Sequence, residues 1–133
     1  MTKVDSTINQ LISQSRVRAS YNPAEDIEKQ HKQYLSLIER AETSGIRQKF
    51  LCHYDATLRL VELLLLQYGY MLDEQPHATA RKIISTIDSS FDFYKLSQVR
   101  HDTKKAGVTP SEKDLNELLA VQRTLNNYIN SNT

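Results

Sequence analysis

The stretch GIRQKFLCHYDATLRLVELLLLQYGY, residues 45–70, decides the fold class. Apolar side chains recur in it every three or four residues, which is the spacing of one face of a helix. They are Phe50, Leu51, Tyr54, Leu58, Val61, Leu65 and Tyr68, with Leu60, Leu63, Leu64 and Leu66 widening the stripe. Because several neighbours are needed to cover so broad an apolar surface, we expect this helix at the centre of a bundle. Any apolar surface that the neighbouring helices leave uncovered would suit a contact between subunits.

Start and stop signals divide the rest of the chain into further helices. A capping residue, a proline and an acid occur together at two places, first Asn22, Pro23 and Glu25, then Thr109, Pro110 and Glu112. Gly107 is expected to be the left-handed residue of a loop over 104–108. We therefore expect helices over about 5–18, 23–45, 45–70, 76–87, 91–101 and 109–130. No strand is expected, because no segment alternates with a period of two.

These helices predict an all-α protein, an antiparallel bundle of four or five core helices with short connections. The 133 residues fall within the usual size of one domain, so we expect a single domain over 1–133. The core bundle would span 22–130. The helix within 1–20 has only a thin apolar stripe and would pack at the periphery, across one end.

Composition excludes several classes of protein. The formal net charge is only +1, so the chain as a whole lacks the basic excess of a typical nucleic-acid-binding protein. Cys52 is the sole cysteine, and the four histidines share no metal-binding spacing, so neither a metal nor another cofactor is expected. No segment approaches the roughly 20 apolar residues of a membrane span, and no signal peptide is recognisable. We expect a cytoplasmic protein.

One polar cluster stands out, directly after an apolar helix. It consists of Arg100, His101, Asp102, Lys104 and Lys105. One interpretation is structural, since cations near a helix C-terminus complement the helix dipole. The other is a ligand site in a groove between subunits, where Arg100 and Lys104 or Lys105 would bind a phosphate-rich molecule.

Three segments resemble the HEPN superfamily of small helical domains, found in bacterial toxin, antitoxin and defence systems. Residues 54–70 are similar to the long helix of that family, which ends in a glycine and an aromatic residue. His77 is similar to the histidine that opens the next helix. Arg100 and His101, followed by Gly107 and the last helix, resemble the family's arginine and polar residue. The resemblance implies the HEPN fold, a homodimer and a connection with RNA or nucleotides.

The catalytic motif of that family is incomplete here. Catalytic members have a histidine four to six residues beyond the arginine, whereas Lys104, Lys105 and Ala106 occupy those positions. Lysine is a poor proton shuttle near neutral pH, so half of the acid–base chemistry is missing. Arg47 and His53 have the required spacing, but they lie about 240° apart around a helix and cannot share one face.

The leading hypothesis is therefore a non-catalytic, HEPN-like domain that acts by binding. It would work as a homodimer and bind either a partner protein or RNA within a defence or toxin–antitoxin-like module. The alternative is a metal-independent ribonuclease of the HEPN type, a toxin that uses Arg100 and His101. A structural adaptor without any role in nucleic-acid binding is the third hypothesis.

Overall fold

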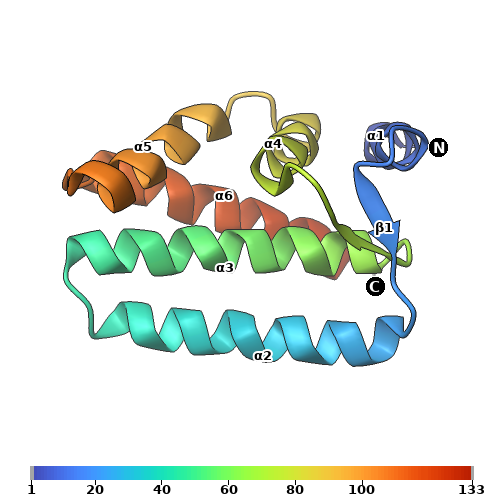
Figure 1. Cartoon of the computed structure of the whole chain (residues 1–133), viewed down its shortest axis with the longest axis horizontal. Coiled ribbons are helices and arrows are strands. Elements are labelled where there is room, and N and C mark those ends of the chain that lie inside the picture. The colour runs from blue at the N-terminus through green and yellow to red at the C-terminus, as the bar shows by residue number, and fades with distance from the viewer. Residues whose placement is uncertain (1, 133) are drawn as a thin grey trace.

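The computed structural model describes residues 2–132 and is mostly helical, as the sequence predicts (Figure 1). Within these residues six helices accompany a single pair of short strands. In chain order the elements are α1 (Lys3–Ser13), β1 (Val17–Ala19), α2 (Pro23–Glu42), α3 (Ile46–Leu66), β2 (Tyr70–Leu72), α4 (Pro76–Ile87), α5 (Phe93–Ala106) and α6 (Glu112–Ser131).

Helix α3 is the central helix, which confirms its predicted position. It contacts α2, α4, α5, α6 and β2. Twelve of its 21 residues are buried, and seven of these join apolar side chains of α1, α4, α5 and α6 in one core. Burial of this stripe is the main force that holds the helices together.

The end of α3 differs from the prediction. The helix stops at Leu66 instead of continuing to Tyr70. The amides of Tyr68 and Gly69 bond to carbonyls three residues back, which tightens the last turn, and Gly69 has a left-handed φ of 84°. The chain thereby leaves the helix axis, and Tyr70 becomes the first residue of β2.

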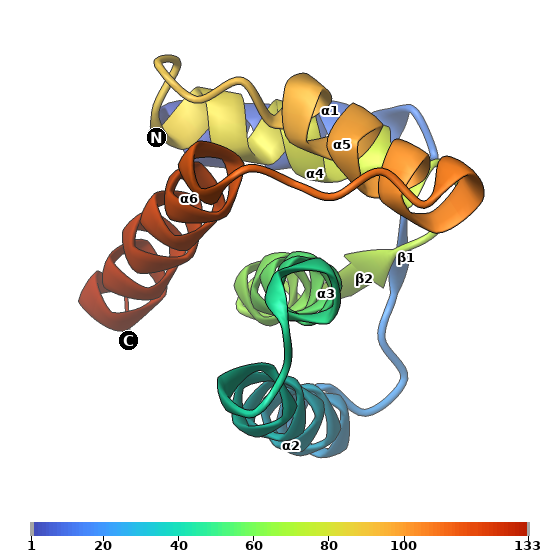
Figure 2. The same cartoon turned by 90° about the vertical axis from the view of Figure 1, so that its left-hand side faces the viewer.

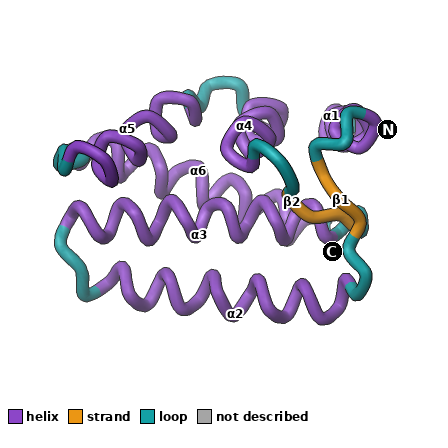
Figure 3. Tube along the Cα trace, in the orientation of Figure 1, coloured by secondary structure: helices purple, strands orange, loops and turns teal. Residues whose placement is uncertain are grey.

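The prediction that the first helix reaches Arg18 and that no strand exists was wrong. Helix α1 ends at Ser13, and a left-handed Ser15 (φ 57°) turns the chain into β1. Strand β1 pairs antiparallel with β2, Arg18 lying opposite Met71 (Figure 3). The strands escaped prediction for two reasons. Each has only three residues, too few to show an alternating pattern, and their pairing joins segments about 50 residues apart.

The connection between α5 and α6 also differs in detail. Lys104 and Lys105 belong to the last turn of α5, so the loop begins later than predicted, while Gly107 is left-handed with φ 67°, as predicted. Ser111 caps α6 in place of Thr109. The reason is a capping box, in which Ser111 and Asp114 each accept a hydrogen bond from the other's backbone amide.

The helices pack in pairs around α3. The short connections make α2 and α3 antiparallel, and likewise α5 and α6, whereas α6 and α3 run in the same general direction (Figure 1). Helix α4 contacts both α1 and α5, and these three helices lie on the side of α3 opposite α2 (Figure 2). Helices α4 and α5 thus cover one side of α3, and the candidate site lies between them. Within residues 2–132, no helix has the length and apolar character needed to cross a bilayer.

Candidate anion-binding site

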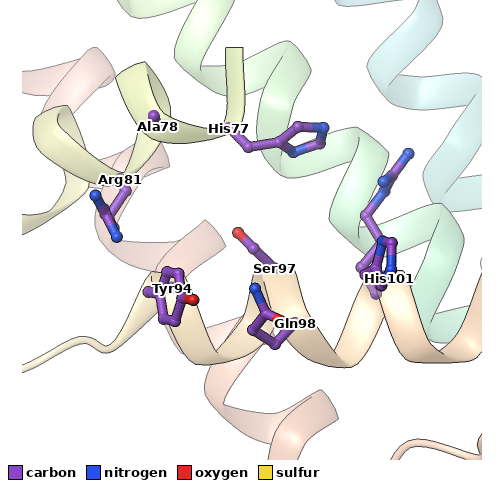
Figure 4. Close-up of a pocket in the computed structure, with 8 residues that line it drawn as sticks. His77, Ala78, Arg81, Tyr94, Ser97, Gln98 and His101 are labelled. Atoms are coloured by element: carbon purple, nitrogen blue, oxygen red, sulfur yellow. The ribbon is translucent and has the colours of Figure 1, made fainter. Parts of the chain in front are cut away.

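A pocket of about 470 Å³ lies between the start of α4 and the middle of α5. We call it the His77 pocket. It carries two guanidinium groups, two imidazoles and no carboxylate, and its lining consists of His77, Ala78, Arg81, Tyr94, Ser97, Gln98, Arg100 and His101. Figure 4 shows His77 and Ser97 on opposite sides of this space, with His101 farther along α5. Such a set of hydrogen-bond donors and cations suits an anion.

The structure brings together only part of the polar cluster singled out in the sequence. Arg100 and His101 both line the His77 pocket. Asp102, Lys104 and Lys105 are exposed residues of α5 that do not line it. Both lysines lie in the last helical turn, where the structural interpretation placed them as complements of the helix dipole.

Tyr54 of α3 is a buried residue that contacts three of the residues lining the pocket, namely His77, Ser97 and Arg100. Its ring, 0% exposed, stacks on Phe93 with the ring centroids 5.2 Å apart. The guanidinium carbon of Arg100 lies over the same ring, 5.3 Å from its centroid. This cation–π contact fixes Arg100 beside the pocket and leaves its N–H groups to bind a ligand.

The Tyr54 hydroxyl connects both sides of the pocket. It lies 2.8 Å from Nδ1 of His77 and 2.9 Å from Oγ of Ser97. Ser97 donates its own proton to the carbonyl of Phe93, at 3.0 Å. All of these groups are satisfied together when Tyr54 donates to Ser97 and His77 donates from Nδ1 to Tyr54.

In this arrangement of the hydrogen bonds, His77 is the tautomer with its proton on Nδ1. With the proton on Nδ1, Nε2 of the neutral ring carries a free lone pair. Among residues 2–132 no group forms a hydrogen bond with that nitrogen. His77 therefore presents an open proton acceptor to a ligand in the pocket.

The surroundings of His77 keep the ring neutral. Burial lowers its pKa from the usual value, and the positive charges of Arg100 and Lys104 lower it further, against the opposing effect of Asp55. Burial also raises the pKa of Tyr54, so that this hydroxyl stays protonated. An anion in the pocket would favour the protonated form of His77 and gain a charged donor.

Several residues of the pocket were not predicted as site residues. Tyr54 was assigned to the core, Arg81 and Ser97 were not considered, and His77 was noted only through the family resemblance. Tyr94 also lines the pocket; it is 53% exposed, and the Arg81 guanidinium carbon lies 5.2 Å from the centroid of its ring. Spacing along α5 could have revealed this set, since residues 94, 97, 98 and 101 lie three or four apart on one helix face.

The pair with the loose catalytic spacing does not form a site. Arg47 donates to the carbonyl of Gly107 at 2.7 Å and holds the end of α5. His53 accepts hydrogen bonds from the amide of Gln122 on α6, at its ring and at its carbonyl. The two residues thus stabilise different helix contacts.

Metal-binding groups and known relatives give no further guidance. In the part of the chain that the structure describes, no three His, Cys, Asp or Glu side chains come together to hold a metal ion. Comparison with family models, with characterised proteins and with solved structures found no significant match.

Proposed function

We propose that the domain binds single-stranded RNA in the His77 pocket without cleaving it. The observation that carries this proposal is the convergence of Arg81, Arg100, His77 and His101 in one pocket without a carboxylate. Guanidinium groups bind phosphate oxygens through paired hydrogen bonds. The pocket is thus locally positive, although the net charge of the whole chain is only +1.

Tyr94 favours a single strand over a duplex. Its ring is 53% exposed at the edge of the pocket, where an unpaired base could stack on it. Base–aromatic stacking contributes about 1–3 kcal/mol for each base and tolerates any sequence. Bases within a duplex are already stacked on each other and cannot use such a ring.

The wider setting follows from the resemblance to HEPN domains. In this proposal the protein is an RNA-binding component of a defence or toxin–antitoxin-like module. A partner protein is the other binding role that the sequence suggests, but a cationic pocket suits phosphate better than a protein surface. Dimerisation is part of the proposal, and exposed Ile27 and Leu35 of α2 supply apolar surface for it. Light scattering that finds only monomer at micromolar concentration would contradict it.

A second candidate function is metal-independent RNA cleavage by Arg100 and His101. The open Nε2 of His77 favours it, because strand cleavage needs one group that accepts a proton from the 2′-hydroxyl and one that donates a proton to the leaving oxygen. His77 and His101 line the same pocket as Arg100. In this alternative, His77 would supply the acid–base group that the sequence motif lacks.

Binding and cleavage can be measured on the same samples. Filter binding of labelled single-stranded RNA should show that Arg100→Ala weakens binding by about tenfold or more, as expected for loss of a charged hydrogen-bond donor. Arg123→Ala, at an exposed position of α6 outside the pocket, is the matched control and should bind normally.

The state of the RNA distinguishes the two functions. Intact RNA after incubation with chelator supports binding alone. Cleavage that persists in chelator and is lost in Arg100→Ala would replace the leading proposal by the ribonuclease. Failure of the folded protein to bind RNA would contradict both.

A further inference from the structure

A second pocket, of about 490 Å³, adjoins the first. We call it the Arg16 pocket. It shares Ala78, Arg81 and Tyr94 with the His77 pocket, and it adds the cations Arg16 and Lys82. The acid in its lining, Asp92, accepts a hydrogen bond from the backbone amide of Lys95 as the cap of α5. The lining of this pocket therefore has three cationic side chains and one carboxylate, and that carboxylate already accepts a hydrogen bond.

Arg16 is an incompletely satisfied donor in this pocket. Its amide donates to the carbonyl of Leu11 at 2.9 Å, which fixes the backbone after the left-handed Ser15. Its Nε atom is buried, yet it has no hydrogen-bond partner among residues 2–132. A buried N–H without an acceptor is costly, so the Arg16 side chain would gain a hydrogen bond by shifting toward an anionic oxygen in the pocket that it lines.

Arg81 and Tyr94 mark the boundary that both pockets share. The Arg81 guanidinium carbon lies 5.2 Å from the centroid of the Tyr94 ring. A ligand that extends from one pocket to the other must pass this pair. Arg81 can bind a phosphate there, while the exposed aromatic ring offers a surface for a base.

We propose that Arg16, Arg81 and Lys82 form a second phosphate subsite for the same RNA strand. The ligand is then a single strand long enough to place phosphates in both pockets at once, with a nucleotide beside Tyr94. The inference rests on the proposed RNA binding and adds to it a minimum length and a second set of residues. A protein ligand would show no such dependence on the number of phosphates.

The experiment compares a uridine dinucleotide with a uridine octamer, both without terminal phosphates, at several salt concentrations. Wild-type protein should bind the octamer more tightly than the dinucleotide. The double variant Arg16→Gln/Lys82→Gln should bind the octamer about tenfold more weakly and the dinucleotide unchanged. The slope of log affinity against log salt should fall by about 0.7 for each phosphate that the variant no longer neutralises.

Two controls keep the result interpretable. Lys113→Gln/Arg123→Gln removes the same charge from exposed positions of α6 and should behave as wild type. Lys82→Glu alters only an exposed side chain, so it tests the subsite even if changes at Arg16 impair folding, and it should weaken octamer binding selectively.

The outcomes separate the two proposals. Octamer binding that is unchanged in the Arg16→Gln/Lys82→Gln and Lys82→Glu variants overturns the second subsite but leaves RNA binding intact. Equal weakening of dinucleotide and octamer also overturns it. If the wild-type protein binds neither ligand, the proposed function itself is wrong.

Discussion

Two buried polar side chains of α3, Tyr54 and Glu62, lie about two turns apart on the same helix and serve different purposes. Glu62 is 5% exposed and accepts a hydrogen bond from the backbone amide of Leu72 in β2. Tyr54 is fully buried, and its hydrogen bonds lead through His77 to an open ring nitrogen at a pocket.

The difference shows how a structural polar group can be told from a functional one. The contact of Glu62 ends on the backbone and fixes β2 against α3. The chain from Tyr54 ends on a ring nitrogen that faces a pocket and is open to water or a ligand. A buried polar residue therefore points to a site when its hydrogen-bond chain leaves an unsatisfied atom at the surface.

The largest effect on stability should come from Glu62→Ala. This change leaves the partly buried Leu72 amide without its acceptor, which costs about 1–3 kcal/mol in the free energy of unfolding. Urea denaturation followed by circular dichroism measures it. Glu62→Gln keeps an acceptor oxygen and should lose less than Glu62→Ala; equal losses would show that the hydrogen bond to Leu72 is unimportant.

Tyr54→Phe should have a smaller effect on stability and a specific effect on His77. Loss of the hydroxyl costs about 1 kcal/mol, while the stacked ring remains. Nitrogen NMR of labelled histidine should show the His77 proton on Nδ1 in the wild type and a mixture of tautomers in the variant. A wild-type His77 protonated mainly on Nε2 would contradict the proposed hydrogen-bond chain.

The smallest effects concern the pH dependence of stability, which His77 and Glu62 change in opposite directions. Burial lowers the pKa of His77, so the unfolded chain binds more protons and stability falls as pH decreases below about 6.5. Burial raises the pKa of Glu62, chiefly through desolvation, so stability falls as pH increases above about 4.5.

Paired variants isolate each contribution. Relative to wild type, His77→Gln should gain stability as the pH is lowered from 7 to 5.5, and Glu62→Gln should gain stability as the pH is raised from 4.5. Thermal unfolding at a series of pH values measures both. Slopes of the same sign for the two variants would show that burial does not set these pKa values as described.

The helices could be predicted from the sequence because their signals are local. The apolar residues of α3 recur every three or four positions, and adjacent Asn22 and Pro23 mark the start of α2. The structure has both helices. The strands could not be predicted, because pairing of Arg18 with Met71 depends on the complete fold. The end of α3 was misplaced because Tyr68 continues the apolar spacing after the helix has ended at Leu66.

The site could be predicted only in part, because some of its residues are neighbours in sequence and others meet only in the complete fold. Arg100 and His101 are neighbours in sequence, so their cluster was visible. Their partners come from elsewhere, His77 from α4 and Tyr54 from α3, and packing brings them together. Tyr54 follows the apolar spacing of α3, and nothing local distinguishes its hydroxyl from that of a packing residue.

The central claim is that RNA binds between α4 and α5, and NMR titration of labelled protein with a uridine octamer tests it most directly. We predict that the largest shifts of backbone and arginine side-chain resonances map to His77, Arg81, Tyr94, Ser97 and Arg100, with α2 unaffected. Shifts concentrated on α2, or no shifts at saturating RNA, would contradict the account.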